Sequence, residues 1–132
     1  MKAKSLPNSV DVGWRRYAIR EWHTPEAVSN GRYGECSHMT AEIRIDTAHD
    51  DELVGAVLLH EITHSILRVF LTNGEGPPTE EQVVTALENG LASVFKANPD
   101  VILWILARFC PELMEKLAPG LQPVFGSVED VG

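Results

Sequence analysis

The longest uninterrupted helical pattern in the chain runs from Asp50 or Asp51 to about Leu71. Acidic residues at its start suit the positive end of a helix dipole, and Asn73-Gly74 provides a stop signal. Leu53, Val57, Leu67 and Leu71 share one stripe with His60 and His64, and Val54, Leu58, Leu59, Ile62 and Ile66 cover much of the remaining surface. A helix that is apolar on most sides belongs at the centre of a domain, so we expect it to be mostly buried.

A second helix is predicted from Thr79 to about Ala97. Thr79 is followed three residues later by Gln82, which is the spacing of a capping box. The Gly- and Pro-rich loop before Thr79 reverses the chain direction, so this helix should run antiparallel to the first. Gly90 costs about 1 kcal/mol relative to Ala inside a helix, and we therefore expect it to permit close contact with a neighbouring element.

Three short strands are predicted before the central helix, at residues 14–22, 33–37 and 42–46. The third is the clearest, because Ile43 and Ile45 alternate with charged residues. A third, C-terminal helix should begin at Asn98-Pro99 and be interrupted near Pro111. The expected fold class is α+β: a short antiparallel sheet of about three strands packed on the central helix, a second antiparallel helix and a C-terminal helix.

A chain of 132 residues has the size of one domain. We expect this domain to span residues 14–119, because residues 1–13 lack periodicity and the third helix should end at Pro119-Gly120. Residues 1–13 and 120–132 are then tails.

The charge balance argues against two classes of partner. There are 19 acidic against 11 basic residues, for a net charge of -8, and the basic residues are scattered. A nucleic-acid surface or an anionic membrane requires clustered Lys and Arg, so neither partner is expected. The N-terminus does not have the pattern of a secretory signal, and Cys36 and Cys110 form no CxxC pair, which together favour a cytoplasmic protein with reduced cysteines. Cys36 precedes His38 by two residues, a minor pattern for metal binding.

The central helix carries the pattern that points to chemistry. His60 and His64 lie four residues apart, hence about 40° apart around the helix, and can share one metal ion. Glu61 lies about 100° from His60, beside such an ion, where it can act as general base toward a water that the metal activates. Two imidazoles, one carboxylate and a water form the usual catalytic set of Zn²⁺. The competing interpretation is that both histidines pack internally in a metal-free helical interaction module.

A third ligand has to come from elsewhere in the chain. Every other histidine lies upstream, so the third-histidine pattern HExxHxxGxxH is absent. Glu80 and Glu81 open the second helix, where acids also stabilise the helix end without a metal. Helical angle slightly favours Glu80 as the ligand. Glu75 and Glu88 are less favoured candidates.

At these residues the sequence resembles a family of minimal zinc metallopeptidases often encoded by phages, of the gluzincin group and similar to the ImmA/IrrE-type peptidases. The resemblance covers approximately residues 34–99. It rests on Gly34-Glu35-Cys36, Ile43-Arg44-Ile45, Leu58-Leu59-His60-Glu61-Ile62-Thr63-His64, Glu81-Gln82-Val83-Val84, Asn89-Gly90-Leu91 and Asn98-Pro99. The HExxH motif is the specific part of this resemblance.

The resemblance implies a zincin-like domain that hydrolyses peptide bonds in a peptide or protein substrate, with His60, His64 and Glu81 as zinc ligands. It also implies a phage or prophage setting, and a substrate that pairs with the strand preceding the active helix, at residues 43–46. Tyr33, His38 and His49 are candidates for an additional donor to the oxyanion, with no spacing argument to choose among them. The main alternative is a regulatory or structural binding protein that retains this fold but cleaves nothing.

Overall fold

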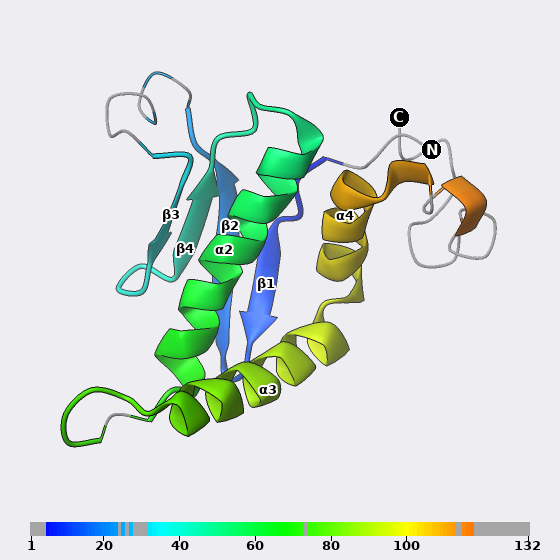
Figure 1. The fold of residues 1–132 in the computed structure, drawn as a ribbon. Coiled ribbons are helices and arrows are strands. Elements are labelled where there is room, and N and C mark those ends of the chain that lie inside the picture. The colour runs from blue at the N-terminus through cyan, green and yellow to red at the C-terminus, as the bar shows by residue number, and fades with distance from the viewer. Residues whose placement is uncertain are drawn as a thin grey trace.

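The structure is a computed structural model that describes residues 5–23, 25, 27, 32–72, 74–112 and 115–117. In chain order it contains strands β1 (Ser9–Val12), β2 (Arg15–Glu21), β3 (Gly34–Ser37) and β4 (Glu42–Ile45), followed by helices α2 (Asp51–Phe70), α3 (Glu80–Ala97) and α4 (Pro99–Phe109). Helix α2 crosses one face of the sheet, with α3 and α4 beside it (Figure 1). The expected α+β class is confirmed.

The sheet differs from the expected one in strand number and direction. It has four strands in the order β1-β2-β4-β3, and β2 pairs with β4 in parallel, while the other two pairings are antiparallel. The expectation of a three-stranded antiparallel sheet was therefore wrong. Strand β4 is inserted between β2 and β3, and this crossover could not be read from the local alternation of apolar and polar residues.

The extra strand is β1, in a segment that was expected to be an N-terminal tail. Val10 and Val12 are completely buried, and β1 pairs with β2 so that Val12 lies opposite Arg15. The connection is thus a two-residue loop whose first residue, Gly13, has a φ of 61°, as type II′ hairpins require. The alternation in this strand covers only four residues, too few to stand out. The expected C-terminal tail at 120–132 lies outside the described residues.

Helix α2 buries one stripe and exposes the opposite one. The stripe against the sheet, α3 and α4 consists of Val54, Leu58, Ile62 and Ile66, each at most 4% exposed. His60 and His64 are each two residues, or about 200°, from Ile62, and both are exposed. The expected central position is confirmed, but the interpretation of the two histidines as internal packing residues is wrong. Helix α2 is also long and apolar enough to cross a membrane, but the core helix of a globular domain has the same length and composition.

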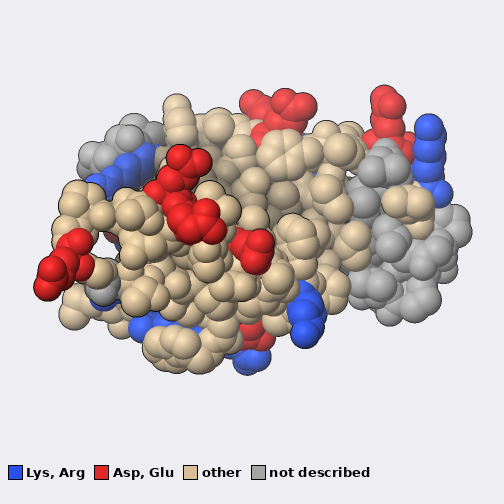
Figure 2. Space-filling view, turned by 60° about the horizontal axis from the view of Figure 1, so that its bottom comes forward, with Lys and Arg blue, Asp and Glu red and all other residues tan. Residues whose placement is uncertain are grey.

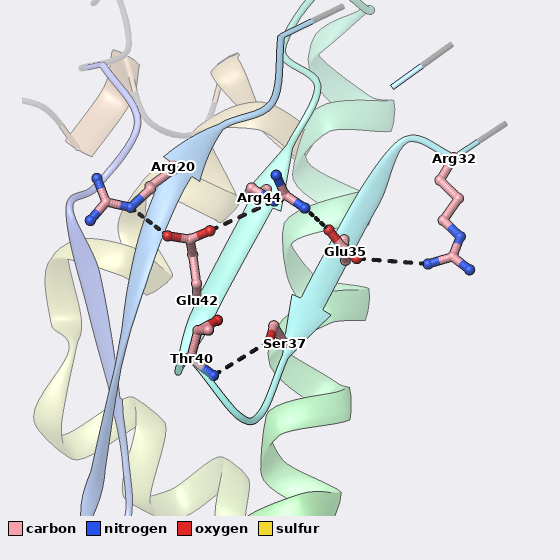
Figure 3. Close-up of polar contacts among 7 residues, drawn as sticks. All are labelled: Arg20, Arg32, Glu35, Ser37, Thr40, Glu42 and Arg44. Carbon is pink, nitrogen blue, oxygen red and sulfur yellow. Dashed lines mark hydrogen bonds and ion pairs between the residues drawn. The ribbon is translucent and has the colours of Figure 1, made fainter. Parts of the chain in front are cut away.

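A row of alternating charges crosses the face of the sheet opposite α2 (Figure 3). Arg20 Nε lies 2.7 Å from Glu42 Oε2, and Arg44 Nε lies 3.7 Å from Glu42 Oε1. Arg44 also pairs with Glu35 on β3, and Arg32 lies 4.0 Å from Glu35. Partly exposed ion pairs are worth about 1 kcal/mol or less each. Their consequence here is that the Glu35 carboxylate is engaged on the outer face.

Asn98, between α3 and α4, fastens these helices to the outer edge of β1. Its side-chain oxygen accepts a hydrogen bond from Asp11 N at 2.8 Å, and its side-chain nitrogen donates to Asp11 O at 2.7 Å and to Val94 O at 3.0 Å. Asn98 is only 4% exposed. All three bonds replace water at groups that would otherwise be buried and unsatisfied.

Helix α3 begins with the expected capping box, because Thr79 and Gln82 exchange side-chain to backbone hydrogen bonds. Gly90 is buried against α2, and a Cβ atom at this position would lie 2.1 Å from Ile66 Cγ2. The predicted close contact at Gly90 is confirmed.

Gly90→Ala should therefore destabilise the protein by about 1–3 kcal/mol, the usual cost of overpacking a close contact. Asn89→Ala is the matched control, because Asn89 is exposed on the same helix and Ala has the higher helix propensity. Urea unfolding of both variants measures the effect. A Gly90→Ala variant as stable as Asn89→Ala would contradict the tight α2–α3 contact.

Candidate metal and catalytic site

A cleft of about 640 Å³ lies between β3 and the exposed side of α2. Strand β3 contributes Gly34, Glu35 and Cys36, and helix α2 contributes Ala56, Val57, His60, Glu61 and His64; Arg32, Tyr33 and His38 complete the lining. All three residues that the HExxH motif singles out therefore face one hollow.

The two histidines of the motif converge in this cleft. His60 Nε2 and His64 Nε2 are 3.1 Å apart, and the rings meet edge to face with centroids 4.7 Å apart. Two nitrogens that bind one tetrahedral zinc ion at about 2.0–2.1 Å lie about 3.3 Å from each other. The nitrogen pair and its chemistry thus fit two ligands of a zinc ion. Because both side chains are exposed, they do not need a metal to satisfy buried polar groups.

Glu61 differs from its histidine neighbours in being buried, with 6% of its surface exposed. Burial raises the pKa of Glu61, and the nearby His60 and His64 offset part of that rise. A Cβ atom added at Gly34 would lie 2.6 Å from Val57 Cγ1 and 3.1 Å from Glu61 Oε2. The missing side chain at Gly34 therefore lets β3 approach the carboxylate, which holds Glu61 in a narrow space beside the two imidazoles.

Glu81, the third ligand implied by the resemblance, is not brought to the two histidines. Glu80 and Glu81 are both exposed in the first turn of α3, and neither lines the cleft. Figure 2, which turns the α3 side of the molecule forward, shows acidic groups standing on its surface. Within the described ranges, no three His, Cys, Asp or Glu side chains form a group that could hold a metal ion. The structure therefore provides two of the expected ligands together, and not the third.

The structure separates the three candidates for an oxyanion donor. Tyr33 and His38 line the cleft, whereas His49 does not. His49 Nε2 lies 3.1 Å from the buried Asp46, and its ring packs edge-on against Tyr33 at 4.8 Å. His49 can thus act on the cleft only through Tyr33.

Tyr17 contacts the imidazole ring of His38 and restrains its position. The Tyr17 hydroxyl and His38 Nδ1 are 3.2 Å apart, and Tyr17 is completely buried. Burial raises the pKa of Tyr17, so its hydroxyl keeps its proton and can donate a hydrogen bond to Nδ1. When Nδ1 accepts this hydrogen bond, the imidazole carries its own proton on Nε2, where it can serve as a donor.

The edge of the sheet at the cleft is β3, not β4. Strand β4 pairs with β2 on one side and with β3 on the other, so the expectation that an extended substrate pairs with residues 43–46 was wrong. Among the described strands, β3 has a partner on one side only. The sequence could not reveal this, because β3 precedes β4 in the chain but lies outside it in the sheet.

The cleft also contains a thiol that the sequence did not single out as reactive. Burial, with the negative charges of Glu61 and Glu35, raises the pKa of Cys36 to about 11. Its Sγ lies 3.8 Å from His38 Nδ1. Cys36 is therefore almost entirely a neutral thiol near pH 7, which makes it a poor nucleophile there.

Iodoacetamide should accordingly label the exposed Cys110 much faster than Cys36 at pH 7.5, and labelling of Cys36 should rise about tenfold per pH unit toward pH 11. Mass spectrometry of the native protein measures both rates. Denatured protein is the control, because unfolding should remove the difference. Equal labelling of the two cysteines in native protein at pH 7.5 would contradict the raised pKa.

Two arginines that line hollows at the candidate site carried no signal in the sequence. Arg32 lines the cleft, and Arg68 lines a smaller hollow beside His64. A lone arginine has no motif spacing, so only the fold reveals these two positions.

Comparison of the chain with protein-family models, with curated proteins and with solved structures finds no match.

Proposed function

We propose that this protein is a zinc-dependent metallopeptidase that hydrolyses peptide bonds. The observation that carries the proposal is the convergence of His60 Nε2 and His64 Nε2, 3.1 Å apart, in a cleft that also contains the buried Glu61 carboxylate. An exposed pair of imidazoles beside a buried carboxylate contributes little to folding. Their arrangement suits a metal ion with a general base next to it.

His60 and His64 would hold the zinc ion, and Glu81 is proposed as the third ligand on the strength of the sequence resemblance. When bound, zinc supplies Lewis-acid chemistry: it polarises a carbonyl oxygen and lowers the pKa of a coordinated water. Glu81 lies in the first turn of α3, which begins near the end of α2 (Figure 1).

Glu61 is proposed as the general base. Its carboxylate would take a proton from the attacking water and later return it to the leaving amine. The low exposure of Glu61 and the rise in its pKa suit a group that has to carry a proton between two steps. Close contact with β3 at Gly34 restricts where the carboxylate can move.

An extended peptide would bind along β3. Its backbone can add to the edge of β3 that has no partner strand among the described residues, and the scissile bond would then lie between β3 and the two histidines. His38 and Tyr33 are the residues proposed to donate to the oxyanion. His38 is favoured because Tyr17 fixes its ring, and a donor held in place costs little reorganisation during the reaction.

One observation favours a second function. The described residues provide only two converging ligands, which also suits a regulatory or structural binding protein with this fold that cleaves nothing. Loss of the third ligand would weaken metal binding while leaving the cleft and the edge of β3 intact.

Metal content is the first test. Wild-type protein loaded with zinc and then desalted should retain about one zinc per chain, and His60→Ala, His64→Ala and Glu81→Ala should each lose most of it. Glu80→Ala and His49→Ala are matched controls that should keep zinc. Mass spectrometry of native protein gives the ratio of zinc to protein chains. A wild type that retains no zinc, or a His60→Ala variant that retains all of it, would overturn the metal site.

Glu61→Gln separates the two functions. The variant should keep its zinc but lose cleavage of a peptide library by at least about a hundredfold, as expected for removal of a general base. Liquid chromatography of the cleaved peptides measures the rate. A zinc-loaded wild type that cleaves no peptide, together with peptide binding that is unchanged in Glu61→Gln, would favour the binding protein.

A further inference from the structure

A second hollow of about 430 Å³ adjoins the cleft. It is lined by His38, His64, Leu67, Arg68 and Leu71. His38 and His64 also line the cleft, so the two hollows share a wall. A substrate residue that follows or precedes the scissile bond can therefore reach this second hollow while the peptide backbone lies along β3.

The second hollow has a basic group and no acid in its lining. Arg68 lies one helical turn after His64 and is exposed. None of the hydrogen bonds or ion pairs found within the described ranges involves its guanidinium group. The lining of the cleft, in contrast, includes the Glu61 carboxylate, and its own arginine, Arg32, lies 4.0 Å from Glu35.

A second arginine, Arg15, lies close enough to His38 for its charge to act on that ring. Arg15 is engaged elsewhere, since its guanidinium lies over the rings of Trp14 and Tyr17. Arg68 is left as the cation that a ligand can pair with.

We propose that this hollow is a subsite for a carboxylate of the substrate. Arg68 presents a planar fork that can hold a carboxylate through two parallel hydrogen bonds, and Leu67 and Leu71 offer apolar contact for the carbon atoms next to it. The carboxylate can come from an Asp or Glu side chain or from the C-terminus of the peptide. This inference rests on the proposed peptidase function.

The net charge of -8 does not favour acidic peptides at long range. A preference for a carboxylate therefore depends on groups at short range. Arg68 is such a group, on the side of the cleft bounded by His64.

Matched peptides test the subsite. The zinc-loaded wild type is given peptides that carry Glu or Gln at successive positions around the cleaved bond, each with a free or an amidated C-terminus. At one position, or for the free C-terminus, the carboxylate should raise kcat/KM about tenfold. The first outcome assigns the subsite to an acidic side chain, and the second assigns it to the chain terminus.

Arg68→Gln should abolish this preference, so that peptides with and without the carboxylate are cleaved with equal kcat/KM. Arg68→Lys should keep part of the preference. Lys96→Gln is the matched control, because Lys96 is an exposed basic residue in the last turn of α3 and its loss changes the net charge equally. Wild-type cleavage that differs neither between Glu and Gln peptides nor between free and amidated C-termini would overturn the subsite, as would an equal effect of Lys96→Gln.

A binding measurement keeps the subsite testable if no peptide is cleaved. Fluorescein-labelled peptides with Glu or Gln, each with a free or an amidated C-terminus, are titrated with the Glu61→Gln protein and with the Glu61→Gln, Arg68→Gln double variant, and anisotropy gives Kd. About tenfold tighter binding of the peptide that carries the carboxylate, lost in the double variant, supports the subsite even if the peptidase proposal fails. Equal binding of all four peptides overturns it.

Discussion

The packing of α2 against the sheet determines the rest of the structure. A single stripe of aliphatic side chains is almost completely buried on that side, and burying each such side chain contributes about 1.5–3 kcal/mol. Because the helix rotates about 100° per residue, this stripe also decides that His60 and His64 face outward and that Glu61 lies at the boundary. Strand β3 lies beside the same helix and forms the other wall of the cleft.

Much of the secondary structure could be predicted from local sequence patterns. The three helices begin close to the predicted residues because caps and prolines act locally, as at Thr79 and Pro99. The order and direction of the strands could not be predicted in the same way. Pairing between β2 and β4 depends on contacts between residues distant in the chain, and β1 is recognised as a strand only once β2 covers Val10 and Val12.

The part of the candidate site that lies on one helix was predictable, and the part that depends on contacts between elements was not. The spacing of His60, Glu61 and His64 follows from helix geometry, and the structure brings these three residues to one cleft. A third ligand on another helix depends on how α2 and α3 cross and on the loop between them, which no spacing rule determines. The exposure of the two histidines was also missed, because Leu53 and Val57 suggested a buried stripe that is in fact only half-buried.

The contact between Asn98 and Asp11 has a consequence for self-association. Exposed strand edges are where sheets of different molecules join and aggregate. On β1, Asn98 occupies the backbone groups of Asp11, and Ser93 accepts a hydrogen bond from Gly13 N at 3.1 Å, so helical side chains already fill this edge. Among the described strands, β3 is then the edge left for a further strand, and Gly34 lies there against α2 beside the cleft. The contact between Asn98 and Asp11 therefore leaves strand addition to the edge that borders the candidate site.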